Sequence, residues 1–466
     1  MFQTERSDTG SEYSHRAPLD AYPQDMSIAG RQRLAFVMAL GIGALWASLH
    51  LRGSYMFYDE WSIIELILHH PARSLVFHTH NGHMWVLASL IYRLQLHGWG
   101  LRSHWFINAV MVASLVALHA ALHRLLRALS VSFLTALLLS GAIAYLGIAA
   151  QNIVFAVQFS LVLSIALAAT AMGTVLGGPP TPRSLVAVAL LAAASVLVEN
   201  GGSLVLVPAL TVLVFGLWGR RATVALLPAW TIAAAWQLLT PAGPSYPASF
   251  GDRLRFATRL LLASAGGLFG QAERVGAVVL VVMSAVVGTA WVTGRLSSRD
   301  RWVVVGGVVS TVCVIGAIAQ SRAGLPGFVD FTDYNRYLQC VALPLTIACT
   351  PAFVAYWHDR PAVGPLVAAA MLVLGVAPLQ SYAATFHAWN HSTRLGVHDV
   401  TVVLRDRCPS GAGPVLESSP LGVLGPQITG TLIADLLRRG MLDTPADGML
   451  DPSVDRAVLK ALCPGG

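Results

Sequence analysis

The stretch Leu34–Leu51, LAFVMALGIGALWASLHL, decides the fold class of this chain. It contains no Asp, Glu, Lys or Arg and is about the length needed to cross the hydrocarbon core of a membrane as a helix. Arg31 and Arg33 precede it and Arg52 follows it. Because cytoplasmic loops carry an excess of arginine and lysine, we expect the N-terminus in the cytoplasm and Arg52 on the outer face.

The composition indicates that many such runs follow. The chain has 466 residues, of which 55% are hydrophobic and 11% charged, whereas soluble domains carry about 25% charged residues. We therefore expect an all-α polytopic protein of the cell membrane with about eleven transmembrane helices. The expected spans are Leu34–Leu51, His104–Leu122, Val131–Ala150, Ile153–Leu176, Ser184–Val198, Ser203–Trp218, Thr223–Thr240, Val275–Thr293, Trp302–Gln320, Tyr337–Trp357 and Val363–Ser381.

The positive charge of the chain follows this topology. The formal net charge is +7, but the arginines sit in short loops beside apolar runs, as the positive-inside rule predicts. No basic run with interleaved aromatics appears, so we expect no nucleic-acid partner. Nearly every inward run meets arginine, which predicts a cytoplasmic N-terminus and an extracytoplasmic C-terminus.

Three segments are expected along the chain: a disordered cytoplasmic tail over 1–30, a transmembrane domain over 31–381 and an extracytoplasmic domain over 382–466. The first outer loop, 52–103, contains Ser62–Leu68 and Met84–Leu96, whose apolar spacing predicts helices lying in the membrane interface. The tail has helical patches over Val397–Arg405 and Ile428–Leu437. Its Cys408 and Cys463 either close a disulfide in the oxidising exterior or remain two thiols.

The stretch Tyr58-Asp59-Glu60-Trp61 carries the most distinctive chemistry of the outer loop. Ionised carboxylates at a bilayer centre cost roughly 3 kcal/mol each, so the pair is expected just outside the hydrocarbon. A carboxylate beside aromatic and lipid surface has its pKa raised by desolvation and can act as a general base. The structural alternative is that Asp59 caps the interfacial helix.

A histidine string follows in the same loop. His78, His80 and His83, with Asn81, have an H-x-H-x-x-H spacing that can ligate a transition metal. No carboxylate or cysteine is obviously paired with the string, so we expect substrate hydrogen bonding or pairing with the acidic residues instead. The sequence identifies no certain cofactor, and a divalent metal is the alternative.

Polar residues also occur at later outer ends. Asp333, Arg336 and Tyr337 stand at the outer mouth of a late span, where an arginine can hold a phosphate with two hydrogen bonds. The alternative is an arginine that snorkels to the interface beside aromatic residues. Two further pairs, Glu199-Asn200 and Gln151-Asn152, fall at outer ends and either line the same cavity or are helix-end polar groups. His119 and His123, near an inner end, are expected to be structural.

This arrangement resembles the GT-C superfamily of membrane glycosyltransferases, which use polyprenyl-phosphate sugars. The residues that carry the resemblance are Asp59 and Glu60 in the first outer loop and Arg336-Tyr337 at a late outer edge. Tyr58-Asp59-Glu60-Trp61 with His80-Asn81-Gly82-His83 further resembles bacterial predicted GT-C-like proteins. By architecture the resemblance covers Leu34 to Ser381, and the tail matches no family that we can name.

The resemblance implies inverting sugar transfer from a polyprenyl-phosphate donor to an envelope glycan, glycolipid or protein on the outer face. Asp59 and Glu60 would be catalytic. Substrate binding would involve Arg336, Tyr337, His78, His80, Asn81, His83, Glu199, Asn200 and Asp333. Grooves between the spans would hold the lipid tail. A multi-span transporter or flippase for lipid-linked saccharides is the competing class, and an envelope scaffold without chemistry is a third.

Overall fold

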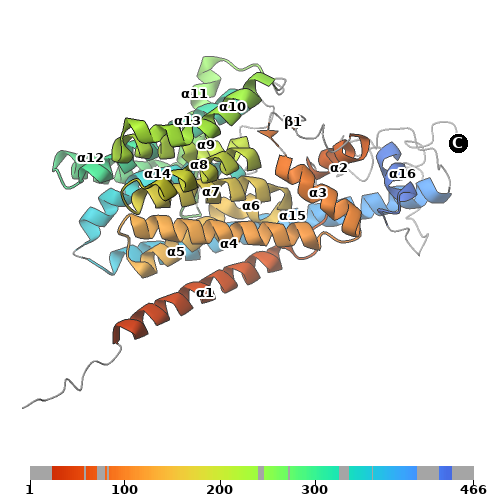
Figure 1. Cartoon of the computed structure of the whole chain (residues 1–466). Helices are drawn as coiled ribbons and strands as arrows, with labels where there is room; N and C mark the ends of the chain where they lie inside the picture. Colours follow the sequence, from red (N-terminus) through yellow and green to blue (C-terminus); the bar gives the residue numbers. More distant parts are fainter. Residues whose placement is uncertain are drawn as a thin grey trace, which may run out of the picture.

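The fold is a bundle of long helices with a small helical assembly at one end (Figure 1). The computed structural model describes residues 24–56, 59–70, 79–80, 83–84, 86–239, 246–270, 273–324, 335–358, 360–406 and 430–442. Apart from one hairpin of two-residue strands, every regular element in this part of the chain is helical. The expected all-α class is therefore confirmed.

Ten helical segments in the described residues are long and apolar enough to cross a membrane. The architecture is that of a multi-pass membrane protein. The helices that make up these segments are α1 (Gln24–Leu51), α4 (Trp105–Ala128), α5 (Phe133–Tyr145), α6 (Ala150–Val154), α7 (Phe159–Leu176), α9 (Asn200–Leu213), α10 (Leu227–Leu239), α12 (Glu273–Val292), α13 (Ser298–Arg322), α14 (Asn335–Trp357) and α15 (Val363–Asp406). Short 3-10 or π-helical turns extend α5, α7, α9 and α10.

The expected eleventh span is the helix α8 (Pro182–Val198). It begins with a capping box between Thr181 and Ser184 and has 17 residues. At 1.5 Å per residue it is about 26 Å long, slightly less than a hydrocarbon core of about 30 Å. For this reason α8 is not among the ten segments long enough to cross a membrane.

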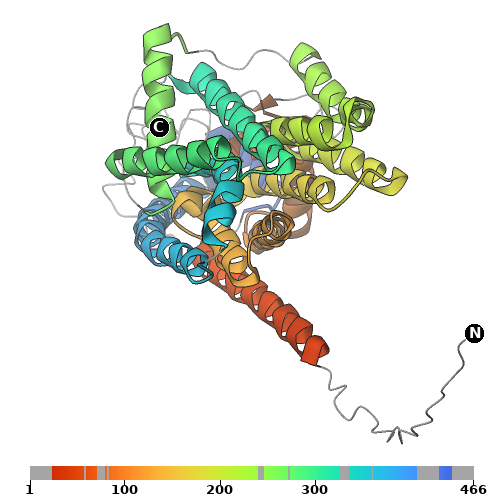
Figure 2. The ribbon, with the colours of Figure 1, turned by 90° about the vertical axis from the view of Figure 1, so that its left-hand side faces the viewer.

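The bundle has two different ends. At the first, which we call the short-turn end, successive helices are joined by the connections 129–132, 177–181, 293–297 and 358–362. The opposite end, the loop end, carries the first long loop and the helices α2 (Asp59–His69), α3 (Val86–Trp99) and α16 (Gly430–Arg438). Viewed from the short-turn end, α1 lies at the periphery of the bundle (Figure 2).

The helix α1 begins earlier than expected. Residues 1–23 lie outside the described part, but the helix already starts at Gln24 and so includes the last residues of the segment 1–30 that we expected to be disordered. Its face toward the surroundings is apolar, with Leu34, Val37, Met38 and Ile42 more than half exposed. Such a face is suited to lipid rather than water.

The amphipathic segment expected after Pro241 is the helix α11 (Phe250–Gly267). Ser249 caps it, and the hydrogen bonds that Ser249 makes with Asp252 hold the pKa of that carboxyl below its ordinary value. Arg259 pairs with Glu273 at the start of α12, with Nε and Oε1 2.8 Å apart. The turn after α11 contacts α15. Gly270 in this turn has a φ of +67°, and a Cβ added to it would stand 2.1 Å from the carbonyl oxygen of Leu374 in α15.

The helix α15 runs through the expected domain boundary. It runs for 44 residues from Val363 to Asp406, so the boundary at 381–382 falls inside one helix. The polar residues after Pro378 mark where the chain becomes less apolar, but a helix that leaves a membrane does not have to end there. The helical patch expected over Val397–Arg405 is the end of α15, and the patch over Ile428–Leu437 corresponds to α16.

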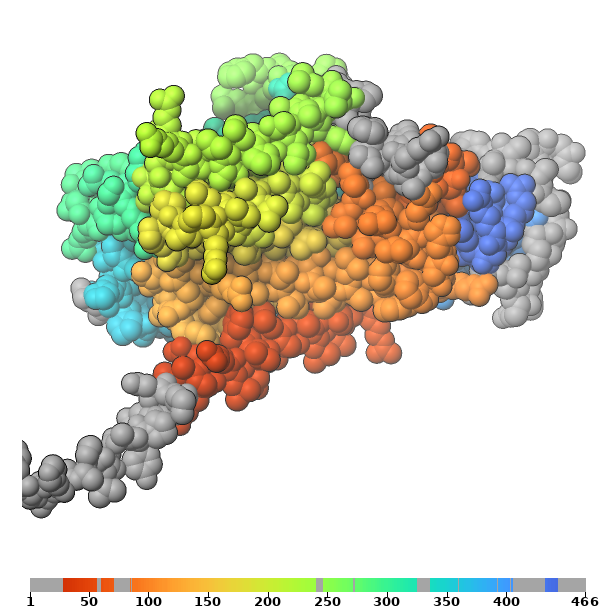
Figure 3. All heavy atoms as spheres, in the orientation of Figure 1, coloured from red at the N-terminus to blue at the C-terminus, as the bar shows by residue number. Residues whose placement is uncertain are grey.

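The first loop and the C-terminal segment form one structure, which we call the loop-end assembly: α2, α3, residues 382–406 of α15, and α16. Two helices expected in the loop are confirmed as α2 and α3. The backbone N–H of Leu101 donates to the carbonyl of Met441 at 2.7 Å, which joins the turn after α3 to the end of α16. Figure 3 shows the α16 surface directly beside that of the first-loop helices.

Candidate functional site

A buried carboxylate organises the first loop. Glu60 is 1% exposed although it stands in the first turn of α2. The Tyr92 hydroxyl of α3 donates a short hydrogen bond to its Oε1, and His104 Nε2 lies 3.0 Å from the same oxygen. Because a buried carboxylate is costly without such partners, these contacts explain how Glu60 is tolerated inside the loop-end assembly.

The network continues from His104 into the transmembrane bundle. His104 Nδ1 lies 3.1 Å from Ser54 Oγ, and the Ser54 hydroxyl donates to Asn108 Oδ1 at 3.0 Å. The Asn108 amide nitrogen donates in turn to the Leu51 carbonyl at 3.1 Å. The chain of contacts fixes α2 against the ends of α1 and α4.

The position of Asp59 follows from that of Glu60. Asp59 is the first residue of α2, and its side chain lies outside the described part. The backbone of Asp59 is held one residue from the buried Glu60 anchor, at the loop end of the bundle. The contacts of Glu60 hold the start of α2 in place, and the catalytic roles of Asp59 and Glu60 stay predictions.

The histidine string forms a small hairpin. The strands β1 (Thr79–His80) and β2 (His83–Met84) pair antiparallel, with His80 opposite His83. The side chains of these two histidines lie outside the described part, as do His78 and Asn81. The backbone N–H of Met84 donates to Asn200 Oδ1 at 3.0 Å, so the hairpin is attached to the first residue of α9.

Glu199, beside Asn200, is held by serines of α7. It is 7% exposed, and the Ser160 hydroxyl donates to its Oε2 at 2.7 Å. The Ser164 hydroxyl donates to the Glu199 carbonyl at 3.0 Å. The close approach of α7 and α9 depends on Gly202, where a Cβ would lie 2.8 Å from Ser164 Cβ. The predicted pair therefore joins the hairpin to the bundle.

Arg336 stands at the start of α14, as expected. Its guanidinium carbon lies 5.0 Å from the centroid of the Tyr337 ring, and Nη2 lies 3.2 Å from the Tyr337 hydroxyl. This contact combines a cation–π interaction with a hydrogen bond. The backbone N–H of Arg336 donates to Gln151 Oε1 at 3.1 Å, and Asn152 donates to Gln339 one turn later. The pair Gln151-Asn152 is thus brought to Arg336.

The Cys340 side chain lies near both Glu199 and Arg336. The Cys340 thiol donates to the Arg336 carbonyl at 3.3 Å and lies within electrostatic range of both the Glu199 carboxylate and the Arg336 guanidinium. Arg336 and Glu199 are therefore both neighbours of Cys340 near the start of α14. Asp333 lies outside the described residues.

Tyr55 connects the first loop to the extended part of α15. Burial raises the pKa of its hydroxyl above the ordinary value, and the nearby Arg394 guanidinium partly offsets this effect. Tyr55 therefore stays neutral across the physiological range. Its ring centroid lies 6.1 Å from that of Trp61, which places residues 382–406 of α15 beside α2.

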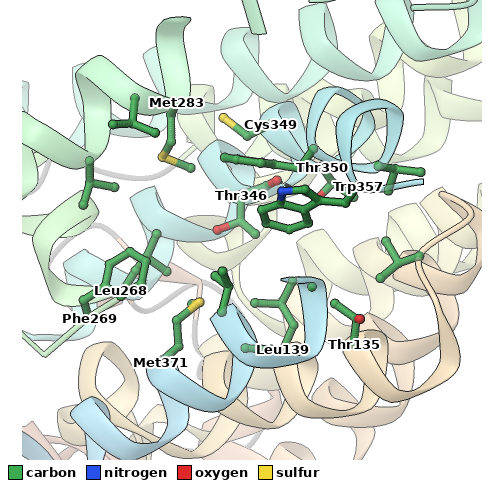
Figure 4. A pocket seen from close by; sticks show the side chains of 18 of the residues that line it. Thr135, Leu139, Leu268, Phe269, Met283, Thr346, Cys349, Thr350, Trp357 and Met371 are labelled. Carbon is green, nitrogen blue, oxygen red and sulfur yellow. Dashed lines mark hydrogen bonds between the residues drawn. The ribbon is translucent and has the colours of Figure 1, made fainter. Parts of the chain in front are cut away.

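The bundle contains an apolar cavity of about 320 Å³ between α5, α12, α14 and α15 (Figure 4). Across this cavity, Thr346, Thr350 and Trp357 of α14 face Leu139 of α5 and Met371 of α15, while Met283, Leu268 and Phe269 close another side. The cavity lies toward the short-turn end and apart from the groups described above.

His119 and His123 pack among aromatic rings, in keeping with a structural role. The ring centroids of Phe36 and His123 are 4.7 Å apart, and those of His119 and Tyr145 are 5.4 Å apart. No group of three or more metal-ligating side chains occurs within the described residues. The histidine string falls outside that search, so the metal alternative stays a prediction.

Several residues of the site had no clear signal in the sequence. Tyr92, His104, Asn108 and Ser54 stand near the ends of apolar runs, where polar residues are common. Gln339 lies one turn inside α14 and was concealed by the apolar run around it. Only a helical-face argument that placed Gln339 beside Arg336 would have found it.

Comparisons with protein families, with curated proteins and with solved structures found no match to this chain.

Proposed function

We propose that the protein is a membrane glycosyltransferase of the GT-C type. It transfers a sugar from a polyprenyl-phosphate donor to an envelope glycan, glycolipid or protein, with inversion at the anomeric carbon. The observation that supports this proposal is the gathering of polar groups from distant parts of the chain at the loop end: the Glu60 network, the hairpin on Asn200, and Arg336 near Glu199.

In the proposed reaction the acceptor hydroxyl oxygen forms a bond to the anomeric carbon, and the bond from that carbon to the phosphate oxygen breaks. Asp59 takes the hydroxyl proton as general base. Glu60 is a positioning residue, because its carboxylate is occupied by Tyr92 and His104. Negative charge grows on the departing phosphate, and Arg336, orientated by Tyr337, stabilises it.

The polar residues around Arg336 suit the donor phosphate. Gln151 contacts the Arg336 backbone, and Asn200 holds the hairpin that carries His80 and His83. Amide and imidazole groups are hydrogen-bond donors of the kind that phosphate and sugar oxygens accept. In this proposal, grooves between the spans hold the lipid tail.

The competing class, a transporter or flippase, requires a polar path through the spans. The cavity of about 320 Å³ between the described helices is instead lined mainly by Val, Leu, Phe and Met. The charged networks that involve Glu60, Glu199 and Arg336 lie at the loop end. This distribution favours chemistry at one surface over transport of a polar solute.

The proposal is tested with purified protein and a panel of polyprenyl-phosphate sugars, scoring release of polyprenyl phosphate in the presence of envelope acceptors. Asp59→Asn should lower the rate of transfer by about 10²–10⁴-fold, the usual contribution of a general base. Membrane insertion and thermal stability should remain those of the wild type.

Asp252→Asn is the matched control, because Asp252 is an exposed first-turn carboxylate of α11 with a capping role. It should keep full activity. Wild-type rates in the Asp59→Asn variant would contradict the assignment of the base, and loss of activity in both variants would indicate a general charge effect.

A further inference from the structure

The apolar cavity of Figure 4 has the dimensions of a lipid chain in one leaflet. It extends along α14 from Thr346 to Trp357, which is about 16 Å at 1.5 Å per residue. This length is about half of a hydrocarbon core of about 30 Å. The volume of about 320 Å³ falls at the lower end of the range of ligand sites.

The chemistry of the cavity excludes a polar occupant. Three threonines are among its lining residues, and each hydroxyl already has a partner: Thr346 donates to the Ala342 carbonyl and Thr350 to the Thr346 carbonyl, both at 2.8 Å. Thr135 Oγ1 lies 2.7 Å from Ser132 Oγ. The remaining lining surface is almost entirely hydrocarbon, so a ligand there gains from apolar burial alone.

The mouth of the cavity opens among side chains suited to lipid. Val278 and Val282 of α12 line the cavity and are 63% and 49% exposed. In a multi-pass membrane protein, such exposed valines in the middle of a span face hydrocarbon. A chain can therefore enter sideways from the membrane without crossing a polar barrier.

Cationic residues flank the short-turn end of the cavity. The Arg127 guanidinium donates to the carbonyl of Val131 at 2.6 Å, and the backbone N–H of Arg360 donates to the carbonyl of Trp357 at 2.9 Å. Val131 and Trp357 both line the cavity, and both arginines are exposed. An exposed arginine at the end of a span can bind a lipid phosphate.

We propose that this cavity binds one acyl chain of an anionic phospholipid from the leaflet at the short-turn end, with the phosphate at Arg127 and Arg360. This site is distinct from the proposed transferase site. Arg336 lies at the opposite end of α14, about 31 Å from Trp357 along the helix. A polyprenyl-phosphate donor bound at Arg336 has its phosphate in the leaflet at the loop end. Arg127 and Arg360 lie at the short-turn end, so they favour a phospholipid of that leaflet as the occupant.

The test uses photo-crosslinking of the full chain in phosphatidylcholine nanodiscs that contain a small fraction of phosphatidylglycerol with a diazirine in its acyl chain. The wild type should be labelled on the α14 segment from Thr346 to Trp357 and at Met283. Unlabelled phosphatidylglycerol should compete with this labelling to saturation, whereas lipid that merely surrounds the protein would not saturate.

A matched pair of variants on α15 separates the cavity from the outer surface. Ala368 is buried and lines the cavity, whereas Ala370, two residues later, is exposed. Ala368→Trp should fill the cavity and lower labelling of the α14 segment about tenfold, equivalent to 1.4 kcal/mol of binding. Ala370→Trp should leave it unchanged.

The headgroup contact is tested in the same assay. Arg360→Gln should weaken competition by phosphatidylglycerol, and Arg183→Gln, an exposed arginine at the same end of the bundle, should not. Unsaturable labelling, or equal labelling in Ala368→Trp and the wild type, would overturn the proposal. Stronger labelling of the same segment by a diazirine polyprenyl phosphate would overturn it as well, because the occupant would then be the donor tail.

Discussion

At the scale of single residues, Glu60 is the acid of the Asp59-Glu60 pair whose side-chain surroundings the structure describes. From the sequence, Asp59 is predicted to be the base, and its neighbour Glu60 either shares that role or orients it. The structure places Glu60 inside a network with Tyr92 and His104, which fixes α2. Sequence could indicate that acids occur in the first loop, but it could not indicate that Glu60 is buried, because its partners are Tyr92 of α3 and His104 at the start of α4.

Tyr92→Phe tests the importance of this network. The variant removes the hydroxyl that donates to a carboxylate that is 1% exposed. We expect a loss of about 1–3 kcal/mol of stability, the cost of an unmade buried hydrogen bond. Thermal unfolding in detergent measures it.

Tyr356→Phe provides the control. The Tyr356 hydroxyl is buried and has no hydrogen-bond partner within the described residues, so its removal should be neutral or slightly stabilising. If the two variants unfolded at the same temperature, the Glu60 network would not stabilise the first loop.

At the scale of elements, the helices of the bundle were predictable from the long apolar runs. Within a membrane, the backbone N–H and C=O groups of such a run must be hydrogen-bonded inside the segment, which a helix achieves. Their ends were less predictable. α15 continues beyond the apolar run to Asp406, because its later turns pack on α16 and the first loop instead of on lipid. Contacts between segments that are far apart in sequence thus determined the element boundary.

The turn between α11 and α12 is another feature that only the structure reveals. Pro378 lacks an N–H, so the Leu374 carbonyl four residues earlier loses its helical donor. Gly270 occupies the space beside that carbonyl with a positive φ of +67°. Only glycine combines this backbone conformation with so close an approach.

Gly270→Ala should therefore destabilise the protein by about 2–4 kcal/mol through left-handed strain and overlap. Gly316→Ala is the control, since a Cβ on Gly316 in α13 meets no heavy atom within 4 Å. That change should be neutral or stabilising by up to about 1 kcal/mol. Equal thermal stability of the two variants would contradict the contact between the α11–α12 turn and α15.

At the scale of the whole molecule, the alternation of helices between a short-turn end and a loop end agrees with the charge pattern of the sequence. The joining of residues 52–103 to the C-terminal segment did not emerge from the sequence. It depends on Gly100, whose positive φ of +60° lets Met441 approach the turn after α3. No periodicity in either segment encodes that pairing.

The orientation in the membrane can be tested with single cysteines in a cysteine-free background. Pro180→Cys lies in an exposed turn at the short-turn end, and Gly251→Cys lies in the exposed first turn of α11 at the loop end. The positive-inside rule predicts that a membrane-impermeant maleimide labels Gly251→Cys on intact cells. Pro180→Cys should react only after lysis. The opposite pattern would invert the topology.

The length of α15 has a mechanical consequence. With 44 residues, the helix is a rod of about 66 Å at 1.5 Å per residue. Its first turns form one wall of the apolar cavity, and its last turns carry α16. For a rod of about 66 Å, a rotation of about 5° at one end displaces the other by about 6 Å. A displacement of the first turns of α15 away from α14 would therefore be carried along the helix to α16 at the loop end.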